Sequence, residues 1–107
     1  MVTVRIETDL EPSGEVELVT DPLHTDTASI QAQMDGDANQ VDISISAKIS
    51  DDHRWSEAYI EDTSIDKQTD KKIETFDITN VVRLRIVVTN VDDTRSADGF
   101  LLSIETS

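Results

Sequence analysis

The sequence contains no cysteine, which excludes disulfides, thiolate metal sites and cysteine nucleophiles together. Aromatic residues make up only 4% of the chain, with one Trp, one Tyr and two Phe. No apolar run exceeds a few residues, and no basic segment precedes an apolar one near the first residue. We therefore expect neither a signal peptide nor a membrane span.

Positive charge is also scarce, because 9 Lys and Arg stand against 23 Asp and Glu, a net charge of −14. Such a chain repels nucleic acid and anionic membranes, so neither is expected as a partner. Its excess of Asp over Glu and its many Thr resemble the proteins of extreme halophiles, above all haloarchaea. Molar salt would screen the self-repulsion over a Debye length of about 3 Å. An ordinary acidic domain is the alternative.

Alternation of apolar and polar residues is the clearest pattern in the chain. Gln40 to Ser50, QVDISISAKIS, places every apolar side chain on one face of a strand. Val81 to Thr89, VVRLRIVVT, supplies a second apolar row and turns Arg83 and Arg85 to the other side. We expect these two rows to face each other across roughly 10 Å, as in the core of a sandwich.

The rest of the chain predicts about eight strands in all, one domain over residues 1–107, and no helix of ten residues or more. Turn residues at Leu10–Gly14 suggest a hairpin between the first two strands, and Asp35–Asn39 a meander between the next two. Thr63–Lys72 reads as a polar loop. The spacing predicts an all-β antiparallel sandwich or barrel. The further strands are expected over Val2–Thr8, Glu15–Thr20, Thr27–Met34, Lys71–Asp77 and Phe100–Thr106, with an ambiguous one over Trp55–Asp62.

Asp35, Asp37 and Asn39 have the D-x-D-x-N spacing of calcium-binding loops. The EF-hand form also needs Gly at the sixth position and an acid at the twelfth, where this chain has Gln40 and Ser46. That form therefore fails, and a plain turn is favoured over a weak Na⁺, K⁺, Mg²⁺ or Ca²⁺ site. No other cofactor is expected. A similar weak site is the alternative for three acids of the last loop, Asp92, Asp93 and Asp98.

No catalytic set is recognisable in the sequence. His24 and His53 lie in separate polar segments, whereas a zinc site needs three or four ligands that converge. No motif brings a serine, a histidine and an orienting acid together. We therefore expect a protein that is not an enzyme.

Two pairs of residues are candidates for contact with other molecules. Trp55 and Tyr59 are either an exposed platform for a sugar or, as we favour for Trp55, a cover over one end of the core. Arg83 and Arg85 are either paired with acids across the sheet or face a neighbouring subunit, since Arg is enriched in interfaces.

Two stretches resemble small β-sandwich structural proteins of tailed viruses. VDISISAKISDDHRWSEA (Val41–Ala58) is similar to their strand followed by Asp-x-x-x-Trp. FDITNVVRLRIVVTNVDDTRSADGFLLSIET (Phe76–Thr106) is similar to their last strands. The resemblance implies a jelly-roll-like scaffold that carries Trp55, Arg83 and Arg85 and that decorates a capsid or builds a tail.

Resemblance and composition together suggest a virion component of a haloarchaeal tailed virus: a capsid decoration or turret protein, or a tail subunit. Such a protein would form a trimer, pentamer or hexamer, pack on other virion proteins in high salt, and reach the virion by assembly in the host cytoplasm. The alternative is a carbohydrate-binding or cell-surface-binding module that uses Trp55, Tyr59 and the segment Asp62–Lys72.

Overall fold

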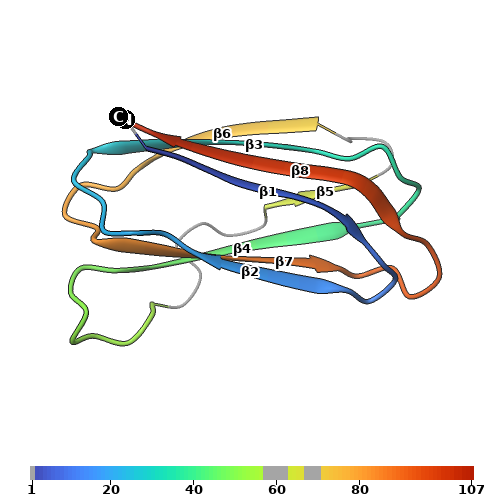
Figure 1. Ribbon diagram of the computed structural model, residues 1–107, viewed down its shortest axis with the longest axis horizontal. Helices are drawn as coiled ribbons and strands as arrows, with labels where there is room; N and C mark the ends of the chain where they lie inside the picture. Colours follow the sequence, from blue (N-terminus) through green and yellow to red (C-terminus); the bar gives the residue numbers. More distant parts are fainter. Residues whose placement is uncertain (1, 57–62, 67–70) are drawn as a thin grey trace.

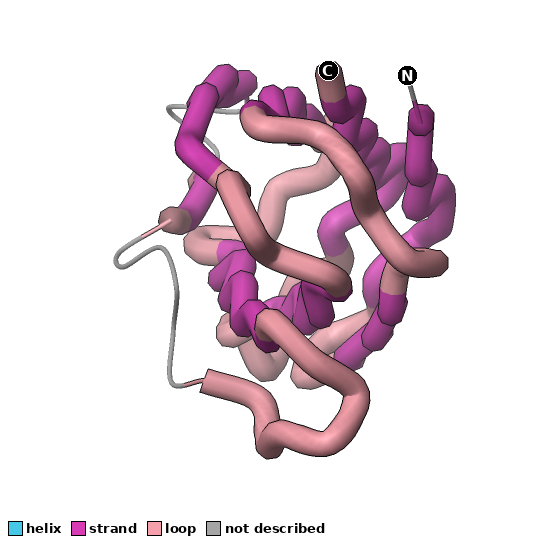
Figure 2. Tube along the Cα trace, turned by 90° about the vertical axis from the view of Figure 1, so that its left-hand side faces the viewer, coloured by secondary structure: helices cyan, strands magenta, loops and turns pink. Residues whose placement is uncertain are grey.

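The computed structural model describes residues 2–56, 63–66 and 71–107, and these residues form eight strands and no helix (Figures 1 and 2). Strands form where apolar and polar side chains alternate, because successive side chains of a strand point to opposite faces. The all-β prediction is confirmed. The strands are β1 (Val2–Leu10), β2 (Glu15–Val19), β3 (Thr27–Gln33), β4 (Val41–Lys48), β5 (Ser64–Ile65), β6 (Lys71–Asp77), β7 (Arg83–Asn90) and β8 (Ala97–Thr106).

The strands make two antiparallel sheets, with the orders β1-β8-β3-β6 and β2-β7-β4-β5. Figure 1 shows them as an upper and a lower layer. The first strand pairs with the last, β2 with β7, β3 with β6, and β4 with β5. A long hairpin rolled up in this way is a jelly roll. The predicted jelly-roll-like sandwich is therefore confirmed.

The core lies between the two sheets and is almost entirely aliphatic. Phe100 is the largest fully buried side chain of the core, and the partly buried Phe76 of β6 packs against the core. The two strands that we expected to face each other, β4 and β7, are instead neighbours in one sheet, with Ile45 opposite Ile86. Their apolar rows lie side by side and pack together against the other sheet. Buried residues of that other sheet include Ile30, Leu102 and Ile104.

Both short turns of the first half carry the chain from one sheet to the other. The predicted hairpin at Leu10–Gly14 is wrong, since β1 and β2 belong to different sheets. The predicted meander at Asp35–Asn39 is wrong for the same reason, since β3 and β4 also lie in different sheets. Turn residues allow a reversal of direction, but they do not decide which strands then pair.

The middle of the chain is less loop-like than predicted. Ser64 and Ile65 form β5 against Asp42 and Val41, and Ile65 is 1% exposed. The segment Thr63–Lys72 is thus a short edge strand at its start and part of β6 at its end. The ambiguous strand over Trp55–Asp62 lies mostly outside the described residues, and Trp55 itself is in no strand.

One end of the sandwich is held together by buried polar groups. The completely buried Asn90 donates from its amide to the carbonyl oxygens of Glu11 (3.1 Å) and Arg95 (2.9 Å), and its Oδ1 accepts from Asp92 N (3.0 Å). Asn90 thereby ties the β1–β2 turn to the β7–β8 loop. A buried amide with satisfied partners fixes the geometry of the loops around it.

The β3–β4 turn is joined to the same end through Gly36. Asp35 N and Gly36 N both donate to Asp98 O, at 2.9 and 3.0 Å. A Cβ atom on Gly36 would overlap Asp98 N and would lie 2.5 Å from Ser96 O. Glycine is therefore required at position 36 because the backbone of β8 lies so close to it. The other common reason for glycine in a turn, a positive φ, applies to Gly99.

We predict that Gly36→Ala destabilises the fold by about 1–3 kcal/mol or more, because the new methyl group must push the turn away from β8. Urea unfolding measures this loss. The matched control is Asp37→Ala, an exposed change in the same turn, which should stay within about 0.5 kcal/mol of the parent chain. Equal effects of the two changes would contradict the role given to Gly36.

Candidate functional site

The outer face of the β2-β7-β4-β5 sheet gathers three cations in adjacent positions. Arg83 and Arg85 alternate along β7 with the buried Leu84 and Ile86 and so point outward. The register places Lys48 of β4 opposite Arg83. Like charges directly opposite each other destabilise a sheet unless other groups compensate.

Asp51 and the β2 end of the sheet compensate part of this charge. Asp51 Oδ1 accepts a hydrogen bond from Arg83 Nε at 2.9 Å and lies 3.8 Å from Lys48 Nζ. Arg83 Nη1 also donates to Thr20 O at 3.0 Å. The Asp51 side chain is 62% exposed, and surface ion pairs of this kind contribute only about 0–1 kcal/mol. They orient the cluster more than they stabilise the fold.

Trp55 lies over the same cations. Lys48 Nζ is 4.6 Å from the centre of its ring, and Arg85 Cζ is 5.4 Å from it. Ser56 fixes this position, because Ser56 N donates to Ala47 O and Ser56 Oγ accepts from Ala47 N, each at 3.0 Å. The favoured interpretation of Trp55 as a cover over the core is therefore wrong: its ring contacts the outside of the sheet.

Arg85 adds a polar group whose needs are not met. Its Nε is buried and has no hydrogen-bond partner in the part of the chain that the structure describes. Leaving such a group unsatisfied costs about 1–3 kcal/mol. This part of the sheet thus combines a buried donor that has no partner with an aromatic ring.

A hollow of about 260 Å³ lies beside Lys48 and is lined by Arg54 and Ser56, the two sequence neighbours of Trp55. Its walls combine apolar and cationic side chains, and Ile49 on its rim is 62% exposed. Drug-sized ligands occupy about 300–1,000 Å³, so this hollow suits one or two side chains of another protein better. The residues around it are Ala47, Lys48, Ile49, His53, Arg54, Ser56 and Val81. We call Trp55, Lys48, Arg83, Arg85 and this hollow the Trp55 patch.

Trp55→Ala is predicted to cost about 1–2 kcal/mol, since two cation–π contacts at a partly exposed site contribute about 0.5–1 kcal/mol each. Phe100→Ala leaves a cavity in the core and should lower the free energy of unfolding by about 3–5 kcal/mol. Urea unfolding followed by circular dichroism compares the two. If Trp55→Ala lowered the free energy of unfolding as much as Phe100→Ala, Trp55 would have to be a core residue, and the position given to it here would be wrong.

The remaining residues predicted as sites do not converge in the described chain. Tyr59 lies outside the described residues, as do Asp62 and residues 67–70 of the segment Asp62–Lys72. The side chains of His24 and His53 hydrogen-bond to no serine or carboxylate within the ranges described. The described residues also contain no helix long and apolar enough to cross a membrane.

Within the predicted cation turn, Asn39 is already engaged by protein groups. Asn39 Oδ1 accepts from Arg95 Nη1 at 3.4 Å, while Asn39 N donates to Asp92 Oδ2 at 3.0 Å. Asp35 lines a hollow of about 390 Å³ together with Glu7 and Asp9. No group of three or more His, Cys, Asp or Glu that could hold a metal ion is found among the described residues. The weak cation site at Asp35, Asp37 and Asn39 stays a prediction.

The Asp92 side chain holds backbone N–H groups of two loops in place. Its carboxylate accepts from Thr94 N (2.9 Å), Thr94 Oγ1 (3.0 Å), Arg95 N (3.1 Å) and Asn39 N (3.0 Å). The backbone N–H groups of Thr94 and Asn39 are the main cause that lowers the pKa of Asp92 from its usual 3.8 to about 2. With its oxygens used in this way, Asp92 organises the loop.

The sequence carried a signal for this role that our reading missed. Asp92-Asp93-Thr94 and Asp77-Ile78-Thr79 share the pattern D-x-T. In both, Oδ1 of the aspartate accepts from the N–H and the hydroxyl of the threonine two residues later. Thr79 likewise lowers the pKa of Asp77. Aspartate that binds the backbone two residues on is a known turn former.

We predict that Asp92 makes part of the stability depend on pH. The unfolded chain protonates this group near pH 3.8 and the folded chain only near pH 2. Its contribution is therefore complete well above pH 3.8 and is lost as the pH falls toward about 2. Thermal unfolding should show that Asp92→Asn lowers the melting temperature at pH 7 by several degrees.

The difference between the parent chain and Asp92→Asn should then shrink between about pH 5 and pH 2. Asp93→Asn, in the exposed neighbour, is the matched control and should follow the parent chain throughout. A difference for Asp92→Asn that stays constant over this range would contradict the assignment.

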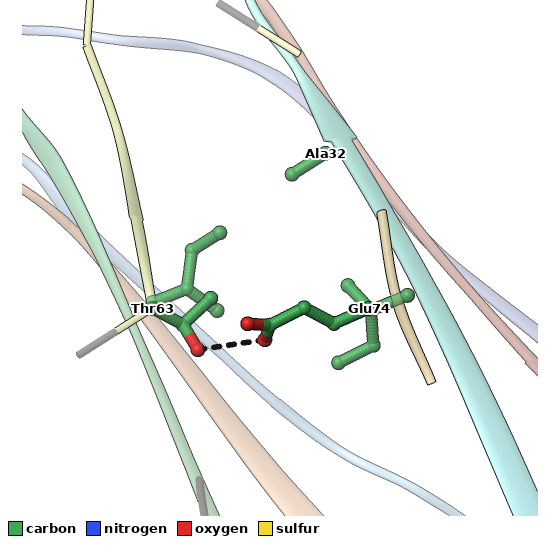
Figure 3. A pocket seen from close by; sticks show the side chains of 5 residues that line it. Ala32, Thr63 and Glu74 are labelled. Atoms are coloured by element: carbon green, nitrogen blue, oxygen red, sulfur yellow. Dashed lines mark hydrogen bonds between the residues drawn. The ribbon is translucent and has the colours of Figure 1, made fainter. Parts of the chain in front are cut away.

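A further carboxylate points into the sandwich. Glu74 lies on β6 opposite Ile30, on the face that is turned to the other sheet. Its Oε2 accepts a hydrogen bond from Thr63 Oγ1 at 3.0 Å, so the pair spans the gap between the two sheets (Figure 3). Ile30, Ala32 and Ile43 surround it. Our sequence reading placed Ile73 and Phe76 in this strand and passed over the acid between them.

Comparison with protein-family models and with curated proteins yields no match to this sequence. The topology of the two sheets and the chemistry of the Trp55 patch therefore carry the functional argument.

Proposed function

We propose that this chain is a non-enzymatic structural subunit of a virus particle, either a capsid decoration or turret protein or a tail subunit, that packs against copies of itself and against other virion proteins. The observation that carries the proposal is the Trp55 patch, which places the single tryptophan and three of the nine cations on one outer sheet face. The virion setting is supported by the resemblance of Val41–Ala58 and Phe76–Thr106 to small sandwich proteins of tailed viruses.

The composition of the patch is that of a protein contact. Trp and Arg are enriched where interfaces bind most strongly, and charged residues buried there need partners. Ile49 and Val19 expose 62% and 46% of their surface beside the cations. Burying these two side chains in an interface would remove apolar surface from water.

High salt fits this mode of assembly. Two copies with a net charge of −14 repel each other over a Debye length of about 10 Å at 0.1 M salt. In molar salt the repulsion is screened, whereas contacts that are buried in the interface are screened much less. We therefore propose a protein that assembles in brine, in the virion, after synthesis in the host cytoplasm.

The experiment is the molar mass by light scattering in about 2–3 M salt and in dilute buffer, where the Debye length differs several-fold. We expect a trimer, pentamer or hexamer at high salt that dissociates in dilute buffer. Arg83→Ala/Arg85→Ala should yield folded monomers at high salt. Arg95→Ala, an exposed cation outside the patch, is the matched control and should assemble like the parent chain. A parent chain that is monomeric at every salt concentration would refute the proposal.

The alternative is a carbohydrate-binding module that uses Trp55 and Tyr59. The position of Trp55 outside the core favours it, but Lys48 and Arg85 already contact the ring, so a sugar needs its other face. Glycan binding that is abolished by Trp55→Ala in a salt-independent monomer would support this alternative over assembly.

A further inference from the structure

We infer that the contact between copies is front to back: the Trp55 patch of one copy binds the outer face of the β1-β8-β3-β6 sheet of the next copy. This inference rests on the proposed function and adds the partner surface and the kind of symmetry. Figure 1 shows the two sheets as separate layers, so their outer faces point in opposite directions.

The charge of the patch rules against contact with itself. Arg54 on the rim of the hollow joins Lys48, Arg83 and Arg85, so four of the nine cations gather here against Asp51 and Asp52. A two-fold contact centred on the patch would place these cations against one another, which costs free energy. The exposed acids of the same outer face, Glu15, Glu17 and Asp42, lie toward the other end of their strands. The rest of the chain is more negative than the whole, so its surface is the electrostatic complement of the patch.

The back of the sandwich offers that complement. Glu7 and Asp9 of β1 and Glu105 of β8 are exposed at alternate positions of their strands, on the outer face of the β1-β8-β3-β6 sheet. Arg5 on this face is paired with Glu7 at 3.5 Å.

Apolar groups match as well as charges. Ile73 of β6 is 70% exposed, and the register places it opposite Gln31 on the same outer face as the acids. Ile49 and Val19 are exposed apolar residues on the side of the patch. Both surfaces thus carry one or two large apolar side chains among charges of opposite sign, which is the usual make-up of a specific interface.

A contact between two different faces is heterologous, and it closes into a ring or continues as a filament, according to the rotation between neighbours. It excludes a two-fold dimer as the assembling unit. A trimer, pentamer or hexamer would each follow from the same contact.

Two variants test the inference by mixing. Arg54→Glu/Arg83→Glu reverses the patch, and Glu7→Lys/Glu105→Lys reverses the back. Each retains one unchanged face, so each alone should be monomeric at high salt, while an equimolar mixture should form complexes that contain both variants. Light scattering measures the mass, and thermal unfolding checks that each variant is folded.

Other outcomes overturn the inference in distinguishable ways. If the back variant alone assembles like the parent chain, the back is not the partner surface, although the proposed assembly stands. This test uses only the back variant, so it can be carried out even if the patch variant fails to fold. Two monomeric variants whose mixture stays monomeric also overturn it. A monomeric parent chain refutes the proposed function itself.

Discussion

The packing of the two apolar sheet faces against each other is the constraint on which the rest of the molecule depends. The chain has few aromatic side chains, so the layer between the sheets is filled mainly by isoleucine, leucine, valine and alanine, while β6 contributes Phe76. Each strand pairs with one that is distant in sequence, except β4 and β5. The core can therefore form only when the whole roll closes.

Alternation along single strands was enough to predict the longer strands but not β5, because alternation depends on local sequence alone and β5 has only two residues. The strand expected over Gln40–Ser50 is β4 (Val41–Lys48), and that over Val81–Thr89 is β7 (Arg83–Asn90). Alternation does not say which strands are neighbours, which is why β4 and β7 were placed in opposite sheets. Pairing follows from the closure of the whole roll, which no single segment encodes.

The candidate site was predictable in its residues and unpredictable in its geometry. Arg83 and Arg85 face outward because they alternate with buried residues, and any reader of the sequence can infer this. Trp55 reaches them only because Ser56 bonds to Ala47 at the edge of β4. That contact has no local signature, since it joins residues nine positions apart through a loop of irregular conformation.

The carboxylate of Glu74 inside the sandwich has a consequence for growth of the sheets. β6 is the last strand of its sheet and β5 the last strand of the other. A charged side chain that points inward on an edge strand discourages another chain from extending the sheet there, since the added strand would have to accommodate the charge in an apolar layer. Copies of this protein are thus steered away from ribbon-like aggregation along this edge, and the broad sheet faces remain open to contacts of other kinds.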